Sequence, residues 1–383
     1  MPLAALRQAR GGDRALASLA DLVRERWAAD AVGLLDSGTH ALTVALQVAA
    51  RFAPVGRTVA LPAYTCYDVA TAAVASGLRI TFYDLDPGTL APDLDSLDQA
   101  LAAGADVVVV APLFGVPVTW DAIRTRVERA GGVLVEDAAQ GHGSSWHGLP
   151  AGSHAPLSVL SFGRGKGWTG GGGGAILARG VAVRHFDFAR DVPHNRSAGT
   201  GAWARAAALA LFAHPELFAI PAAVPWLHLG ETRYHEPTPT RGMVAAAAGM
   251  LLATWEAAQH EAEGRRLSAA RYLAELTATP AVRPVLVDAN GVGGYLRFPL
   301  FTARGMEGFA SPERARRLGI TPGYPAPLPQ LGAVLTSLAE PSRSRRFPGA
   351  EALSRQLVTM PTHSFVRPEE QREILRLVHG YQL

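Results

Sequence analysis

Cysteine and lysine are almost absent from this chain of 383 residues. The one cysteine, Cys66, excludes an internal disulfide and any metal site built from several cysteines, and it fits a reducing compartment. Of the 36 basic residues, every one except Lys166 is arginine. An amine can lose its proton and form a Schiff base, whereas a guanidinium stays protonated, so Lys166 is expected where arginine cannot serve. The alternative is that one lysine remains by chance. The residues around Lys166 must decide between these two interpretations.

Strong charge of one sign and long apolar runs are also lacking. The formal net charge is only +3, and the basic residues are scattered, which argues against a nucleic-acid partner. Residues 1–27 carry charges throughout and have no apolar core of a signal peptide. Prolines and charged residues interrupt the most apolar stretch, 203–229, which favours a buried helix pair or a substrate lid over a membrane contact. We therefore expect a cytoplasmic protein without a membrane span.

Short apolar runs alternate with amphipathic segments in the first part of the chain. This alternation predicts an α/β layered fold with a mostly parallel sheet. Strands are expected at 31–35, 57–61, 79–83, 105–111 and 132–136, and helices after residue 39, at 71–76 and at 120–130. Beyond about residue 240, a smaller α+β domain is indicated by helices at 243–263, 267–278 and 368–378 and a strand at 294–300. We place the large domain at 1–240 and the small domain at 241–383.

Polar residues gather where several of these strands end. They are Ser37 to Thr39, Tyr64 to Tyr67, Asp137 to Gln140 and Ser161 to Lys166. Ligands of such sheets bind beyond the carboxyl ends of the strands. The segment around Lys166 is not a Walker A loop, because Gly167 follows the lysine, and it is not a dinucleotide fingerprint, because Trp168 takes the third glycine's place. The histidines at 142, 147 and 154 match no usual zinc spacing, so no metal is expected.

The remaining constellation suits pyridoxal phosphate. This cofactor needs a lysine amine, a carboxylate against its pyridine nitrogen and donors for its phosphate. Lys166 provides the amine, Asp137 provides the carboxylate, and Ser37, Gly38 and Thr39 provide donors at a helix N-terminus. Taken one at a time, a turn-capping role for Asp137 and a plain N-cap role for Ser37 remain open. Their joint occurrence with the only lysine favours the cofactor.

Longer stretches of the sequence resemble a known family. These include DSGTHALTVAL, VEDAAQGHG, SFGRGKGWTGGGGGAIL and LGITPGYPAPL. They are similar to the DegT/DnrJ/StrS sugar aminotransferases, roughly over Ala31 to Arg190 and from Thr240 to the end. The resemblance implies the fold-type-I architecture of pyridoxal-phosphate enzymes, in which a three-layer αβα large domain is followed by a smaller α+β domain.

The resemblance also implies roles for individual residues. Lys166 matches the Schiff-base lysine, Asp137 the residue on the pyridine nitrogen, and Gln140 the residue facing the ring hydroxyl. Ser161, Gly38 and Thr39 match phosphate ligands. Cys66 stands where the family usually has an aromatic ring that stacks on the cofactor. His142 matches a histidine near the reacting end, and Tyr324 is expected to line the substrate pocket.

The implied activity is a transamination by a homodimer. An amino acid, glutamate in most of the family, gives its amino group to a keto group, here expected on a nucleotide-linked sugar. The segment 195–234 matches nothing in the family and predicts a changed lid or acceptor pocket. A cofactor-binding homologue without turnover and an enzyme acting on a non-sugar keto substrate remain alternatives. Lys166 argues against the dehydratase branch, which has histidine there, and the early position of Cys66 argues against a cysteine desulfurase.

Overall fold

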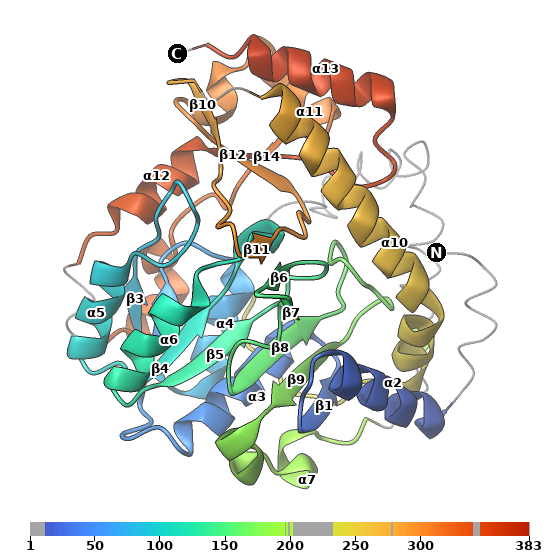
Figure 1. The fold of residues 1–383 in the computed structure, drawn as a ribbon. Coiled ribbons are helices and arrows are strands. Elements are labelled where there is room, and N and C mark those ends of the chain that lie inside the picture. The colour runs from blue at the N-terminus through green and yellow to red at the C-terminus, as the bar shows by residue number, and fades with distance from the viewer. Residues whose placement is uncertain are drawn as a thin grey trace.

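A mostly parallel sheet of seven strands forms the centre of the large domain (Figure 1). The computed structural model describes residues 12–195, 197, 200–201, 233–276, 279–339 and 345–382. Four neighbouring pairs are parallel, and β9 runs against both of its neighbours. In spatial order the strands are β1 (Ala31–Leu35), β9 (Gly174–Ala178), β8 (Leu157–Ser161), β5 (Val133–Asp137), β4 (Val107–Val110), β2 (Thr58–Pro62) and β3 (Arg79–Tyr83).

Helices cover both faces of this sheet. On one side α3 (Gly38–Ala50) packs against α4 (Tyr67–Ser76), and on the other lie α5 (Leu94–Ala102) and α6 (Trp120–Arg129) (Figure 1). The four valines of β4 are fully buried, as expected for a parallel strand with helices on both sides. The predicted three-layer α/β fold is therefore confirmed.

The small domain has its own antiparallel sheet and its own apolar core. Its strands, in spatial order, are β10 (Val282–Pro284), β12 (Phe298–Thr302), β14 (Leu357–Met360) and β13 (Thr321–Pro322). Three helices accompany them, α11 (Pro312–Arg317), α12 (Pro348–Gln356) and α13 (Pro368–His379). Tyr272, Phe298 and Ile374 are at the centre of the core. The predicted α+β character is confirmed.

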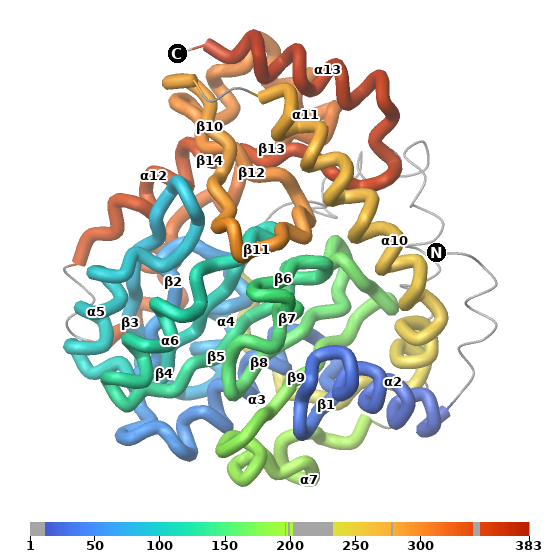
Figure 2. The backbone as a smooth tube through the Cα atoms, viewed as in Figure 1, coloured from blue at the N-terminus to red at the C-terminus, as the bar shows by residue number. Residues whose placement is uncertain are grey.

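One long helix, α10 (Ala245–Glu275), joins the two domains (Figure 2). Its first half packs against α2 (Asp13–Arg26) and places Leu251 in a core cluster of the large domain, whereas Tyr272 belongs to the small-domain core. The predicted division into helices at 243–263 and 267–278 was wrong, because the helix continues through Gly264. Packing of each half onto a different domain outweighs the helix-weakening effect of one glycine. The domain limits at 240 and 241 stay a prediction.

Other differences from the sequence expectations are local. Helix α4 begins at Tyr67, four residues before its predicted start, and the predicted strand at 294–300 lies instead at Phe298–Thr302. The short elements are α7 (Phe188–Asp191) and a small sheet of β11 (Gly291–Val292), β6 (Ser145–Trp146) and β7 (Leu149–Pro150). Nearly all of segment 195–234 lies outside the described residues. Within the described part of the chain, no helix has the length and apolar character needed to cross a bilayer.

Candidate functional site

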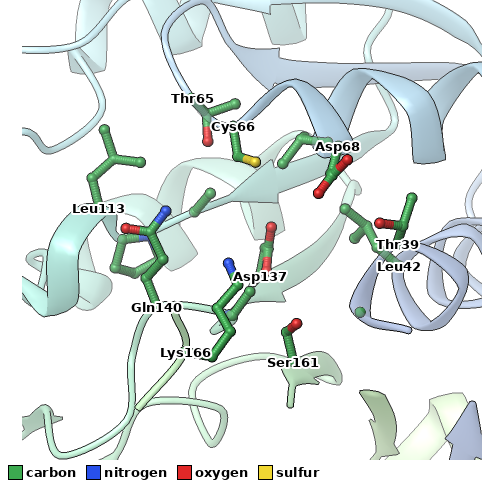
Figure 3. Close-up of a pocket in the computed structure, with 15 residues that line it drawn as sticks. Thr39, Leu42, Thr65, Cys66, Asp68, Leu113, Asp137, Gln140, Ser161 and Lys166 are labelled. Atoms are coloured by element: carbon green, nitrogen blue, oxygen red, sulfur yellow. Dashed lines mark hydrogen bonds between the residues drawn. The ribbon is translucent and has the colours of Figure 1, made fainter. Parts of the chain in front are cut away.

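A pocket opens at the carboxyl ends of five strands. Its walls come from the segments that follow β1, β2, β4, β5 and β8, so the structure brings together the strand ends identified in the sequence (Figure 3). The lining residues are Gly38, Thr39, Leu42, Thr65, Cys66, Asp68, Val69, Ala111, Pro112, Leu113, Asp137, Ala139, Gln140, Ser161 and Lys166. Six of the sequence-predicted residues therefore share one cavity with the only lysine.

Lys166 lies in the turn between β8 and β9, and its amine points toward Asp137 (Figure 3). The glycine-rich run after it allows close backbone contacts. A Cβ on Gly170 would lie 2.7 Å from the Ala247 carbonyl oxygen, and one on Gly174 would lie 2.4 Å from the Ser37 carbonyl oxygen. Any larger residue would push this loop away from α10 and from the start of α3. The glycines therefore position the loop that carries Lys166.

Asp137 is the last residue of β5 and is only 8% exposed. Its Oδ1 accepts a hydrogen bond of 3.0 Å from the Ala139 N–H. Burial raises the pKa of this carboxyl above its ordinary value, while the Lys166 amine and the Ala139 N–H act in the opposite direction. A buried carboxylate needs a cationic or N–H partner, and Lys166 is the cation that the structure places opposite it.

The N-terminus of α3 forms one end of the pocket. Ser37 is the N-cap of this helix, and its Oγ accepts a 3.1 Å hydrogen bond from the His40 N–H. Gly38 and Thr39 are the first two helical residues, and first-turn N–H groups have no partner within their helix. A Cβ on Gly38 would lie 2.6 Å from Ser161 Oγ, so the two elements approach as closely as glycine permits. This combination of N–H groups and hydroxyls is typical of a phosphate site.

Ser37 is thus an N-cap and does not line the pocket. The sequence left a plain N-cap role open for Ser37, and the hydrogen bond from the His40 N–H is such a contact. Its predicted contact with the cofactor stays a prediction.

Gln140 connects the pocket to the small domain. Its Oε1 accepts from the Phe114 N–H at 2.8 Å, which assigns the amide orientation, and its Nε2 donates to Tyr324 Oη at 2.6 Å. The Tyr324 ring stacks on Phe114 with centroids 6.1 Å apart. Burial raises the pKa of the Tyr324 phenol well above its ordinary value, so this phenol keeps its proton. Tyr324 is not among the residues that line this pocket, but it contacts one of them, Gln140, from 184 positions away in the sequence. Its predicted place in the substrate pocket stays a prediction.

Cys66 lines the same pocket at the start of α4, with its sulfur directed into the cavity (Figure 3). Burial, assisted by the negative charge of Asp68, raises the pKa of its thiol to about 11. Cys66 is therefore a neutral thiol at physiological pH and offers a small polarisable surface. It occupies the position where the sequence resemblance expects an aromatic ring.

His142 does not line this pocket. Its Nε2 lies 3.3 Å from the Ala258 carbonyl oxygen of α10, and its ring contacts those of Trp168 and Trp255. Burial lowers the pKa of its imidazole to about 4, so the ring is neutral near pH 7. The structure thus places His142 in an aromatic cluster behind the Lys166 loop, and its predicted substrate contact stays a prediction.

Asp68 is the charged lining residue that sequence reasoning missed. It is the second residue of α4, and the predicted start of this helix at residue 71 left it in a loop. Had the helix been predicted to start at Tyr67, Asp68 would have been a candidate pocket residue. The first-turn side chains of α4 lie at the same edge of the sheet as Thr39. Among the described residues, no group of three or more His, Cys, Asp or Glu side chains is arranged to hold a metal ion.

Comparison with known proteins gives the same family as the sequence motifs. Residues 17–184 match the DegT/DnrJ/EryC1/StrS aminotransferase family, which confirms the resemblance for that part of the chain. An L-glutamine:2-deoxy-scyllo-inosose aminotransferase from Streptomyces paromomycinus is 33% identical over 165 residues. That match covers 43% of this chain and only 37% of the relative, so the chain spans well under half of the relative's length.

Solved structures match over nearly the whole chain. A sugar aminotransferase from Micromonospora echinospora aligns with a TM-score of 0.74 at 20% identity, over 99% of this chain and 97% of that one. A protein from Streptococcus pneumoniae described as a sugar aminotransferase, in its PMP form, aligns with a TM-score of 0.71 at 20% identity. This match covers 95% of this chain and 90% of that one. At this level of identity the likeness establishes the fold, and the predicted fold-type-I architecture is confirmed.

Proposed function

We propose that this chain is a pyridoxal-phosphate-dependent aminotransferase that moves an amino group from an amino acid, expected to be glutamate, to a keto group of a nucleotide-linked sugar. The observation that carries the proposal is the only lysine of the chain facing the buried carboxylate of Asp137 at the carboxyl ends of the sheet. The match of residues 17–184 to an aminotransferase family supports it.

The residues of the pocket fit each part of this cofactor. Lys166 Nζ would bind its aldehyde carbon, and Asp137 would pair with its pyridine nitrogen. Gly38, Thr39 and Ser161 would hold its phosphate at the α3 N-terminus, where a Cβ on residue 38 would close the space. When bound, the cofactor supplies an electron sink for the carbon that loses a proton.

Lys166 does the proton work in this scheme. Once it is free, Nζ would be the base that takes a proton from the donor Cα and the acid that gives a proton back. Proton transfer by a positioned side chain is worth roughly 10²–10⁴ in rate. The negative charge of Asp137 would favour a proton on the pyridine nitrogen of the bound cofactor.

Gln140 and Tyr324 offer donors to the substrate side. The Gln140 Nε2 has a second hydrogen beyond the one it gives to Tyr324, and the Tyr324 O–H accepts from Gln140 while its own proton stays available. Both suit the hydroxyl and keto oxygens of a sugar. The name of the Streptomyces relative specifies a polyhydroxylated cyclic ketone and glutamine as donor, so glutamine should be tested beside glutamate.

We also propose that the chain works in the cytoplasm as a homodimer with its sites at the subunit interface. The single free cysteine supports the reducing compartment, and the family resemblance supports the dimer. Analytical ultracentrifugation of the purified protein tests this assembly. A sedimentation coefficient of a monomer at micromolar concentration contradicts it.

Borohydride trapping tests the cofactor assignment directly. Purified protein is supplied with pyridoxal phosphate, reduced, digested and analysed by mass spectrometry, and the adduct is expected on the peptide that contains Lys166. The matched variant Lys166→Arg keeps the charge and cannot form the bond, so it should give no adduct. An unmodified Lys166 peptide in the wild-type protein overturns the proposal.

Amino donors and keto acceptors then separate the alternatives. Glutamate or glutamine should bleach the visible absorption of the lysine-bound cofactor, and a panel of nucleotide-linked ketosugars should restore it. An adduct that no donor bleaches identifies a binding protein without turnover. Restoration only by non-sugar ketones supports the other acceptor class.

A further inference from the structure

Asp68 places a second carboxylate in the cofactor pocket. It lines the cavity together with Gly38, Thr39 and Ser161, and Figure 3 shows its carboxylate on the side of the pocket where Thr39 lies. The negative charge therefore faces the end of the pocket that suits a phosphate.

The charges of the pocket do not balance. Of its lining residues only Asp68, Asp137 and Lys166 are charged, and no arginine is among them. Lys166 and Asp137 face each other, which leaves the charge of Asp68 without a counterpart in the lining (Figure 3). Burial is the main cause of the raised pKa of the Cys66 thiol and of the Asp137 carboxyl, and the charge of Asp68 adds to both shifts, so its field reaches these two groups. An anion entering the pocket meets this same field.

A phosphate at the α3 N-terminus is attracted by N–H groups and repelled by Asp68. We propose that Asp68 weakens the grip of this pocket on the cofactor's phosphate, so that retention depends on the bond to Lys166 and on contacts with the ring. This inference rests on the proposed function. Its consequence is that the aminated cofactor, which has no bond to Lys166, leaves the protein readily and exchanges with free cofactor.

Pyridoxamine phosphate and pyridoxamine are the probes for this effect. Neither bonds to Lys166, and they differ only in the phosphate, so comparing them isolates the phosphate contribution. Dissociation constants are measured by titration calorimetry on wild-type protein freed of cofactor and on Asp68→Asn, which removes the charge and keeps the shape. At an effective dielectric constant of about 20, one charge at close range changes affinity about tenfold or more.

The expected result is that Asp68→Asn binds pyridoxamine phosphate about tenfold or more tightly and does not bind pyridoxamine more tightly. High salt should reduce the difference in pyridoxamine phosphate affinity between the wild-type protein and Asp68→Asn. Asp95→Asn is the matched control, because Asp95 is likewise the second residue of its helix, α5, and lies outside the pocket. This control should leave both constants unchanged.

Unchanged or weaker binding of pyridoxamine phosphate by Asp68→Asn overturns the inference. Equal tightening of pyridoxamine does so as well, because the effect is then unrelated to the phosphate. Borohydride trapping on the wild-type protein keeps the two proposals separate. If an adduct is trapped at Lys166 but Asp68→Asn has the same dissociation constant for pyridoxamine phosphate as the wild-type protein, only the role of Asp68 is refuted. If no adduct forms, the cofactor assignment itself is refuted.

Discussion

At the scale of single residues, the charge of Asp137 determines what Lys166 can do. Asp137 is buried at the end of β5, and the cation opposite it is Lys166. A carboxylate in such surroundings is costly unless a cation or N–H group compensates it. A protonated pyridine nitrogen meets this requirement in the proposed complex. Asp137 and Lys166 are therefore expected to act together, and substituting one of them at a time tests the role of each.

Asp137→Asn removes the charge and keeps the shape of the side chain. Without a negative partner the pyridine nitrogen loses its proton, and the ring withdraws electrons less strongly. We expect the rate of the donor half-reaction to fall about 10²–10³-fold, as for the loss of a major electrostatic contact in an active site. Stopped-flow absorption of the bound cofactor measures this rate. Asp137→Glu keeps the charge and should retain more activity than the asparagine variant, and the reverse order contradicts the assigned role.

His142 gives the folded protein a specific sensitivity to acid. Its pKa in the fold is about 4, below the ordinary value of 6.5, so the unfolded chain binds the proton first as pH falls. Stability therefore decreases between pH 6.5 and 4, and this one group should cost about 2 kcal/mol between pH 7 and pH 5. His142→Gln removes the titration. Urea unfolding at both pH values should show a smaller loss in the variant, and an equal loss in both proteins would refute the assignment.

At the scale of elements, α10 shows how packing overrides a local signal. The sequence near Gly264 predicts a break, and the structure continues the helix through it. A Cβ added at Gly264 meets nothing within 4 Å, and the residue has ordinary helical backbone. The glycine is therefore a weak point of α10 without a steric purpose.

Gly264→Ala should stabilise the protein. Alanine restricts the unfolded chain and is better suited to a helix interior, which is worth about 0.5–1 kcal/mol. The measurement is the free energy of unfolding in urea. Gly174→Ala is the opposing control, because its Cβ would lie 2.4 Å from the Ser37 carbonyl oxygen, and it should destabilise the fold. Destabilisation by Gly264→Ala would mean that the helix needs flexibility there.

At the scale of the whole molecule, two tyrosines of the large domain hold a small-domain segment at the pocket. The Tyr64 Oη accepts from the Tyr324 N–H at 2.7 Å. The Tyr67 Oη accepts from the Ala326 N–H at 3.0 Å and donates to the Ala326 carbonyl oxygen at 3.2 Å. These bonds position Tyr324 beside Gln140, so this side of the pocket depends on contact between segments about 260 residues apart in the chain.

Tyr67→Phe should disturb both stability and turnover. It leaves the Ala326 backbone groups without their partner, which costs about 1–2 kcal/mol, and it releases the segment that carries Tyr324. We expect kcat/KM for the acceptor to fall about tenfold, as for a misplaced positioning group. Tyr83→Phe is the control, because its hydroxyl also bonds a buried carbonyl, that of Val109, within the large domain alone. Equal kinetic effects in both variants would argue against a role at the pocket.

Much of this protein was determined by its sequence alone. Apolar periodicity located most strands of the sheet, and among the basic residues the use of arginine everywhere except position 166 singled out Lys166 as the candidate reacting amine. These signals are local in the sequence, so they can be interpreted without knowledge of the fold. Tertiary structure alone decided which distant side chains meet. It put Tyr324 on Gln140, directed His142 into a cluster of tryptophans and brought Asp68 into the pocket. Such contacts depend on side-chain direction and on packing between remote elements, which no periodicity in the chain encodes.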